Sequence, residues 1–309
     1  MRVLIVKNPR AGRGDAGLFD FVNMLGSEGA EVVVRYLTGE RDVARAVDDA
    51  DAFDRVVAAG GDGTVSAVAY ALRSSGVPVL AFPAGTANLI ASNLGLSADP
   101  RALANLALEG EDAPVDVGEL EYHELMPEGL GPARTTGFVM AAGAGFDARV
   151  IDGARDLKAA LGPAAYLVAA LRNLTPTVAR FHMRLDGRDV ETEGIAVMLA
   201  NFAQLQFEIS VAHRSDPRDG KADVVVLATR TVPELLPAVW AGFLDGTVDL
   251  PHRPGVELHT ASEIELVAEP ALPLQADGES LGAHTPLTAR MLPHAARFIV
   301  PSGSRLLEG

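Results

Sequence analysis

Hydrophobic residues in the first 120 positions follow two alternating patterns. Continuous apolar runs, typical of buried strands, occur at residues 2–9, 31–38, 53–60 and 77–83. Between these runs, residues 15–29, 40–50, 65–72 and 86–96 carry apolar positions at helical spacing. Strands that alternate with helices in this way predict an α/β domain with a parallel sheet covered on both faces.

The pattern changes near residue 134, where short strand-like segments with alternating apolar and polar positions take over. They lie at residues 134–146, 180–187, 189–201, 222–229, 256–269 and 289–301. Two helical patterns interrupt them at 157–174 and 231–244, and residues 121–132 look like a connection between domains. We predict an α/β domain over 1–125 and an antiparallel β domain with helical insertions over 126–294. The segment from about 295 to 309 is expected to return to the first domain.

Three glycines and one carboxylate stand where the third strand run meets a helix, within VVAAGGDGTVSAVAYAL at 56–72. Gly60, Gly61 and Gly63 permit close approach of the backbone to a ligand, and their N–H groups form an anion pocket with the helix N-terminus. Asp62 would repel a bare phosphate, so it implies an intervening metal ion or proton transfer from a hydroxyl. The alternative is a tight turn with Asp62 near the N-cap. We favour the ligand-binding interpretation.

Two more strand exits carry glycines and polar residues. The segment FPAGTANL at 82–89 turns on Gly85 and presents Thr86 and Asn88 at a helix start. In VKNPRAGRG at 6–14, Lys7 or Arg10 could contact phosphate or could equally be solvated charges. In parallel sheets, ligands bind beyond the carboxyl ends of the strands, where all three exits are expected. The GGDGT turn is neither a Walker A loop nor a dinucleotide fingerprint, and the catalytic set of a protein kinase is missing.

Composition narrows the possible partners. The 309 residues include 26 Lys and Arg against 41 Asp and Glu, a formal net charge of −15. This charge argues against a nucleic-acid surface and against general attraction to anionic lipid, so any membrane contact would be local. Without cysteine there is no disulfide, thiolate zinc site or thiol nucleophile. No apolar stretch is long enough for a membrane span or a secretory signal, so we expect a cytoplasmic protein.

The histidines show no paired spacing typical of a zinc site, and Ser66 has no histidine nearby in sequence that would suggest a Ser-His-Asp hydrolase. Acidic residues, in contrast, recur late in the chain. In LPLQADGESLG at 272–282, Asp277 and Glu279 would lie on one side of an extended chain. Taken alone this segment is better explained as a surface hairpin, but with the earlier loops it supplies a carboxylate pair suited to phosphoryl transfer. The loop SDPRDGKAD at 215–223 suits a hard cation or is a plain solvated turn.

Several segments together are similar to one family. They are NPRAG at 8–12, Thr38, GGDGT at 60–64, PAGTAN at 83–88, VDVG at 115–118, GAGFDA at 143–148, DGKAD at 219–223 and ADGES at 276–280. In order and spacing they resemble the diacylglycerol kinase catalytic family, in its bacterial lipid-kinase branch, which is related to sphingosine kinases and distantly to NAD kinases. The resemblance implies an ATP- and Mg²⁺-dependent lipid kinase. It also implies a Rossmann-like nucleotide domain of the NAD-kinase type, a β-sandwich domain and a cleft between them.

The resemblance also implies residue roles. Nucleotide contacts are expected at Asn8, Pro9, Gly12, Thr38, Gly60, Gly61, Asp62, Gly63, Thr64, Gly85, Thr86 and Asn88. The family's structural magnesium loop falls on Asp216, Asp219 and Lys221, and Asp116 matches a position of the catalytic magnesium network. The proton acceptor falls on Glu279 or Asp277, or on Asp62 as in the sphingosine kinases.

Three positions depart from the family pattern. Ser66 and Ala67 stand where the family commonly has Asn-Glu, and Leu89 stands where it commonly has Asp. The leading hypothesis is transfer of the ATP γ-phosphoryl group to a hydroxyl of a diacylglycerol-like lipid. The alternatives are an NAD kinase, another alcohol kinase of the superfamily, or a catalytically weak nucleotide- or lipid-binding regulator.

The hypothesis carries expectations about partners and location. A lipid substrate with a free hydroxyl implies transient membrane contact, while nucleic acid is not expected. An acyl-chain site could lie against the apolar helix at 157–174, although packing within the β domain explains that helix better. Exposed edge strands of the β domain make a homodimer possible. The protein is expected to be cytoplasmic and at most peripherally membrane-associated.

Overall fold

The structure is a computed structural model. It describes residues 1–11, 16–39, 42–126, 129–145, 176–202, 215–231 and 255–307. The chain forms two compact units, each described below by itself. The first comprises Met1–Val117, Gly137–Met140 and Leu292–Gly309, and the second comprises Gly118–Thr136 and Ala141–Met291. The long strands β5 (Glu111–Met126) and β15 (Glu279–Val300) each contribute residues to both units, and the domain limits predicted from sequence fall within them.

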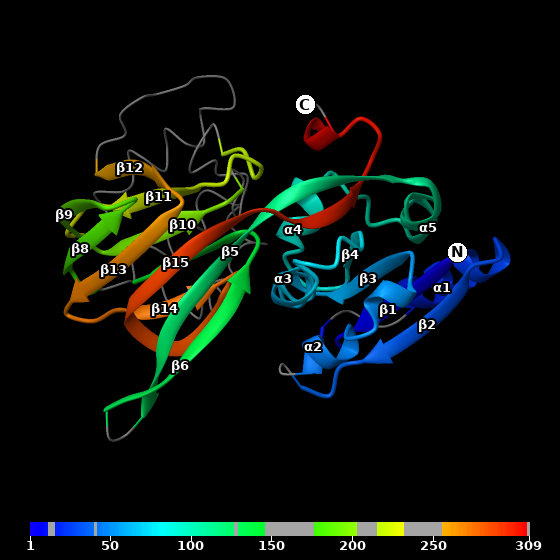
Figure 1. The fold of residues 1–309 in the computed structure, drawn as a ribbon, viewed down its shortest axis with the longest axis horizontal. Coiled ribbons are helices and arrows are strands. Elements are labelled where there is room, and N and C mark those ends of the chain that lie inside the picture. Colours follow the sequence, from blue (N-terminus) through cyan, green and yellow to red (C-terminus); the bar gives the residue numbers. More distant parts are fainter. Residues whose placement is uncertain are drawn as a thin grey trace, which may run out of the picture. The chain divides into compact units, whose positions relative to one another are not determined.

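The first unit is built on a parallel sheet (Figure 1). Its strands are β1 (Arg2–Lys7), β2 (Glu31–Tyr36), β3 (Arg55–Gly60), β4 (Val79–Pro83) and the end of β15, in the order β15-β4-β3-β1-β2. Val3 to Val6 of β1 and Val56 to Ala59 of β3 are fully buried, as expected for strands covered on both faces. The predicted α/β parallel sheet is confirmed.

Five α-helices accompany this sheet in the described part of the unit. They are α1 (Ala16–Ser27), α2 (Val43–Ala46), α3 (Asp62–Ala71), α4 (Leu89–Asn93) and α5 (Pro100–Glu109), with single 3-10 turns at Ala50–Ala52 and Arg305–Leu307. The helix predicted over 40–50 is wrong in length, because Val43–Ala46 is its only α-helical part among the described residues. Valine and clustered aspartates, such as Asp48 and Asp49, favour helix interiors weakly.

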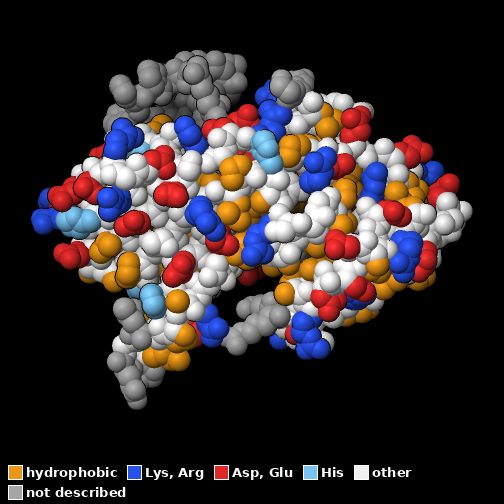
Figure 2. Space-filling view, in the orientation of Figure 1, with side chains coloured by type: hydrophobic (Ala, Val, Ile, Leu, Met, Phe, Trp, Pro, Cys, Tyr) orange, Lys and Arg blue, Asp and Glu red, His pale blue; other side chains and the backbone are white. Residues whose placement is uncertain are grey.

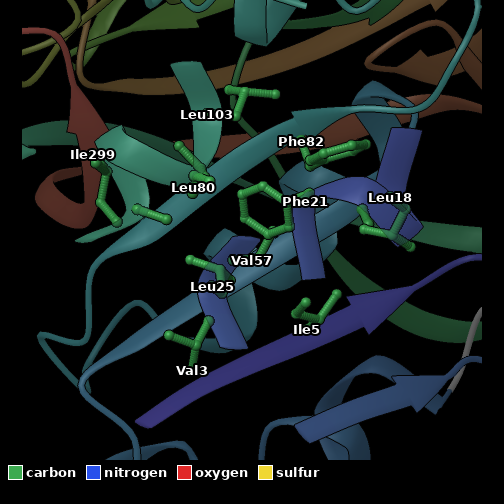
Figure 3. Packing of buried hydrophobic residues seen from close by; sticks show 13 residues of the cluster. Val3, Ile5, Leu18, Phe21, Leu25, Val57, Leu80, Phe82, Leu103 and Ile299 are labelled. Atoms are coloured by element: carbon green, nitrogen blue, oxygen red, sulfur yellow. The ribbon is translucent and has the colours of Figure 1, made fainter. Parts of the chain in front are cut away.

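Apolar side chains from the sheet and from helices α1 and α5 form one core in this unit (Figure 3). Phe21 of α1 meets Phe82 of β4 edge to face, with ring centroids 5.2 Å apart. Helix α5 adds Leu103, and its first turn is fixed by Asp99, whose side chain accepts a hydrogen bond from the N–H of Ala102. Ile299 of β15 joins the same cluster, so the carboxyl-terminal strand belongs to this core.

The second unit is antiparallel β structure, as predicted. One run of strands is β12-β11-β10-β7-β14-β15, formed by β7 (Ala141–Ala144), β10 (Ala196–Ala200), β11 (Ala222–Leu227), β12 (Val256–Ala261) and β14 (Pro273–Ala276). A second run is β9-β8-β13-β15, formed by β8 (Ala179–Leu185), β9 (Arg188–Gly194) and β13 (Glu263–Glu269). Strand β6 (Gly129–Phe138) pairs with β5.

Three predictions for this unit need correction. The single strand predicted over 189–201 divides at Gly194, where any Cβ would collide with the carbonyl of Leu227. The strand predicted over 256–269 divides at Ser262, between β12 and β13. Residues 121–132 are not a connection between domains, because they belong to the β5–β6 hairpin. The helical patterns at 157–174 and 232–244 lie outside the described residues, and no described helix is long and apolar enough to cross a membrane.

Candidate nucleotide site and acidic loops

The register of the parallel sheet brings the predicted strand exits to one edge. Lys7 at the end of β1 pairs with Ala59, and Gly60 at the end of β3 pairs with Pro83 at the end of β4. Gly60 has no room for a side chain, because an added Cβ would lie 2.6 Å from the hydroxyl oxygen of Thr64. Helix α3 therefore begins immediately after β3, with Gly61 as its N-cap residue.

The two glycine turns are in direct contact. A Cβ added to Gly85 would lie 2.5 Å from the Cα of Gly61 and 3.2 Å from its nitrogen. Asn88, in the left-handed conformation at φ 51°, closes the second turn on itself. Its Oδ1 accepts a hydrogen bond from the N–H of Gly85 at 2.7 Å, and its Nδ2 donates to the Gly85 carbonyl at 2.9 Å. The contact requires glycine at position 85, whereas a Cβ added to Gly61 would lie at an ordinary 3.7 Å from the Cα of Gly85.

The side chain of Asp62 links the first glycine turn to the helix that follows the second. Its Oδ1 accepts a hydrogen bond from the N–H of Ile90, in the first turn of α4, at 2.8 Å. The N-cap residue of α3 is Gly61, and no side chain caps that helix. Asp62 thus caps the neighbouring helix α4, which the sequence did not indicate. From the described residues, its second oxygen, Oδ2, receives no hydrogen bond.

Asn8 links the first strand exit to α3. Its Nδ2 donates to the Thr64 hydroxyl at 2.9 Å, and its Oδ1 accepts from the N–H of Arg10 at 3.0 Å. Lys7 is only 2% exposed, and its ammonium group donates to the Ala11 carbonyl at 3.1 Å. The solvated alternative for Lys7 is therefore wrong, and this lysine braces the 8–11 loop.

The remaining predicted nucleotide residues lie around these turns. Pro9, Thr38 and Thr86 are exposed, and the Thr38 hydroxyl donates to the Asp42 carboxylate. Gly63 lies in the first turn of α3. Gly12 lies outside the described residues. These nucleotide contacts stay predictions.

Asp116 and Ser66 are both enclosed by protein. Asp116 in β5 is fully buried, and its Oδ1 accepts a hydrogen bond from the N–H of His294 at 2.7 Å. Ser66 in α3 is 2% exposed, and its hydroxyl has no hydrogen-bond partner within the described part of the chain. A buried hydroxyl without a partner is unfavourable, so Ser66 is, among the described residues, an unsatisfied polar group beside the GGDGT turn.

The residues present fit a magnesium ion that is held mainly by its nucleotide. Among the described residues, no cluster of three or more acidic, histidine or cysteine side chains could hold a metal ion. Mg²⁺ commonly takes one or two protein carboxylates and fills its remaining positions with phosphate oxygens and water. Asp62 can supply one such oxygen, whereas the carboxylate of Asp116 is closed off from solvent.

The acidic loop at 215–223 is satisfied by its own groups. Both oxygens of Asp216 accept from Arg218, at 3.0 and 3.3 Å, and Asp219 accepts from the N–H of Lys221 at 2.8 Å. Asp223 accepts from the Ser215 hydroxyl, and burial raises its pKa above the usual value for an aspartate. The guanidinium of Arg218 stands where a cation would bind Asp216. A magnesium role for Asp216, Asp219 and Lys221 stays a prediction.

The DGE segment forms a tight hairpin. Ala276 of β14 pairs with Glu279 of β15, and the two residues between them both have positive φ, 46° at Asp277 and 80° at Gly278. This is the backbone required by a type I′ turn, for which Asp-Gly is a preferred pair. The surface hairpin predicted for this segment taken alone is confirmed. Asp277, with its positive φ, therefore does not share one side of an extended chain with Glu279.

The two carboxylates of the hairpin, Asp277 and Glu279, have different surroundings. Asp277 is anchored to β7, since its Oδ1 accepts from the N–H of Ala141 at 3.0 Å and its own N–H donates to the Ala141 carbonyl at 2.8 Å. Glu279 is exposed at the first position of β15. Of the two carboxylates, Glu279 is the more exposed.

Comparison with known proteins accounts for both halves of this chain. Residues 2–120 match the model of the diacylglycerol kinase catalytic domain. Residues 140–300 match the YegS C-terminal NAD kinase beta sandwich-like domain. The chain belongs to the diacylglycerol kinase catalytic-domain family, in its YegS-like branch.

Relatives in this family align over nearly the whole chain. One named "Probable lipid kinase YegS-like", from Klebsiella pneumoniae (strain 342), is 29% identical over 99% of this chain and 98% of its own. Another of the same name, from Pseudomonas aeruginosa PAO1, is 33% identical over 91% and 88%. A crystal structure described as a diacylglycerol kinase from Bacillus anthracis str. Sterne superimposes with a TM-score of 0.72 at 19% identity, covering 98% of both chains. At that identity the likeness shows the fold.

Proposed function

We propose that this protein is a lipid kinase that transfers the γ-phosphoryl group of ATP to a hydroxyl of a diacylglycerol-like lipid. The family and the names of the relatives support a kinase with a lipid acceptor. One observation carries the nucleotide part of the proposal. The turns at Gly61 and Gly85 touch through their backbones, at the edge of the sheet where nucleotides bind in α/β folds.

The first unit offers the phosphates fixed donors. Backbone N–H groups at the start of α3 and the positive end of its dipole favour a phosphate beside Gly61. Asn8 holds the Thr64 hydroxyl, and Asp62 holds α4, so these groups are in position before the ligand arrives. Mg²⁺, when bound through Asp62, would neutralise charge on the β- and γ-phosphates.

The chemical step requires a proton acceptor. The lipid hydroxyl oxygen forms a bond to the γ-phosphorus, the bond from that phosphorus to the ADP oxygen breaks, and the hydroxyl proton moves to a carboxylate. We assign that carboxylate to Glu279, because its side chain is exposed at the first position of β15, whereas Asp277 is partly buried. If Asp62 were the acceptor instead, Glu279→Gln would leave turnover unchanged.

The test is transfer of labelled phosphate from ATP. Purified protein is incubated with Mg²⁺ and a panel of diacylglycerol, phosphatidylglycerol, a sphingoid base and NAD. Label in a lipid supports the proposal, and label only in NADP refutes it. Asp62→Asn and Glu279→Gln are each expected to lower kcat by roughly a hundredfold or more. The matched control is Glu265→Gln, an exposed charge on β13, for which no change is expected.

A further inference from the structure

The β5–β6 hairpin stands apart from the rest of the second unit. From Glu121 to the end of β5 no residue is buried, whereas Val115 to Gly118 in the same strand all are. Strand β6 pairs with β5 and with no other strand in the described part of the chain. In Figure 1 this hairpin extends beyond the other labelled strands of its unit. The projecting part of the hairpin therefore has no hydrophobic core of its own.

The last two residues of β5 place apolar side chains on both faces of that strand. Leu125 and Met126 are each 48% exposed, and as consecutive strand residues they point to opposite faces. Met126 lies across the hairpin, because a Cβ on Gly131 would come within 2.7 Å of its Cγ. Pro132 of β6 is also exposed. Figure 2 shows hydrophobic side chains gathered on this projection.

Behind this apolar end lies a belt of amphipathic and paired polar residues. Arg134 donates to Glu124 at 2.7 Å, and a ring nitrogen of His123 lies 3.0 Å from the Gly131 carbonyl oxygen. Tyr122 is partly buried in the same belt. Tyrosine and arginine, each with an apolar body and a polar end, suit the boundary between hydrocarbon and water.

We propose that the end of the β5–β6 hairpin, carried by Leu125 and Met126, inserts into the surface of an electrically neutral lipid bilayer. A flat protein partner would cover one face of the hairpin, whereas a bilayer surrounds both. The arginine of the belt, Arg134, is paired with Glu124, and Glu121 in the same strand as Glu124 is exposed. With the net charge of −15, this arrangement disfavours anionic lipid. The biological purpose of this membrane contact rests on the proposed function, because a lipid kinase must reach its substrate in the bilayer. The contact itself does not require catalysis.

Vesicle flotation of the full chain without ATP tests the contact. Wild-type protein is expected to float with phosphatidylcholine vesicles, and replacing part of that lipid by phosphatidylglycerol is expected to weaken binding. The double variant Leu125→Ser/Met126→Ser is expected to lower the partition coefficient roughly tenfold. The control is Leu258→Ser/Val267→Ser, since these side chains are 49% and 42% exposed on β12 and β13. Equal thermal melting of all variants establishes that the fold is intact.

Three results would overturn the inference: no flotation of the wild type, equal flotation of both double variants with the wild type, or stronger binding to anionic vesicles. Light scattering adds a fourth. If the hairpin variant changes a dimer to a monomer and leaves flotation intact, the occupant is a second copy of this chain.

A kinase assay separates this inference from the proposed function. With diacylglycerol embedded in vesicles, the hairpin variant should lose activity. With short-chain diacylglycerol dissolved in water, it should match the wild type. Equal activity of the variant and the wild type on vesicles would contradict the inference. Hairpin-dependent flotation without any kinase activity would sustain the membrane contact and refute the proposed function.

Discussion

Replacing Gly85 by alanine tests the contact between the two glycine turns. The new Cβ would lie 2.5 Å from the Cα of Gly61 and 3.0 Å from Oδ1 of Asn88. Unbonded carbon atoms pack at about 3.5–4.0 Å, so the turns must separate by about 1 Å. Overpacking of this kind costs about 1–3 kcal/mol. Separation would also stretch the 2.8 Å hydrogen bond from Ile90 to Asp62, and a bond to a charged group is worth about 1.5–3 kcal/mol.

The expected loss in the free energy of unfolding is therefore about 2–5 kcal/mol, measured by urea denaturation. Because the displaced backbone also carries the N–H groups proposed to bind phosphate, the Kd for ATP should rise at least roughly tenfold in calorimetric titration. Gly26→Ala is the matched control. Gly26 lies inside α1 with open space around it, so alanine should stabilise the protein by about 0.5–1 kcal/mol. A Gly85→Ala protein with wild-type stability and ATP affinity would refute the proposed arrangement of the turns.

Three further predictions concern the buried ammonium group of Lys7, the carboxylate of Asp62 and the phenol of Tyr122. Lys7→Met should lower the free energy of unfolding by about 1–3 kcal/mol and raise the Kd for ATP, because the Ala11 carbonyl loses its buried donor; unchanged urea and ATP titrations would contradict this. Asp62→Asn retains an oxygen for the N–H of Ile90, so it should melt closer to the wild type than Asp62→Ala does, while both lose turnover. Burial, reinforced by Glu124, raises the pKa of Tyr122, so the folded protein holds this proton to higher pH than the unfolded chain. Stability should therefore fall as the pH rises above the unfolded value of about 10, and Tyr122→Phe should abolish this part of the slope in urea titrations at alkaline pH.

Sequence patterns predicted the elements whose signals are local. The apolar run over Val3 to Val6 could only be a strand buried on both faces, and the helical spacing over 15–29 produced α1. The pair Asp99-Pro100 was a capping signal for α5 that could have been used, since it places an N-cap aspartate before proline. The pair Asp277-Gly278 likewise indicated a tight turn from sequence, and both residues take positive φ in the structure.

The divided strands and the extra caps could not be found in this way. Gly194 ends β9 because the backbone of Leu227 lies against it, and that neighbour is set by strand register. Likewise Asp62 caps α4 rather than its own helix, and Asp116 is buried against the backbone of His294. Each partner is tens of residues away in the chain, and the intervening fold decides which backbone donor reaches the carboxylate.

By itself, the amino-acid sequence determined the alternation of strands and helices up to about residue 96, the parallel and antiparallel character of the two halves and the glycine turns of a family of lipid kinases. These features follow from short-range periodicity and from residues whose backbone preferences act within a few positions. The tertiary structure alone decided that Gly61 touches Gly85, that Lys7 is buried, and that Leu125 and Met126 end an exposed hairpin. Those facts depend on strand pairing and close packing between distant segments, which a local pattern does not encode.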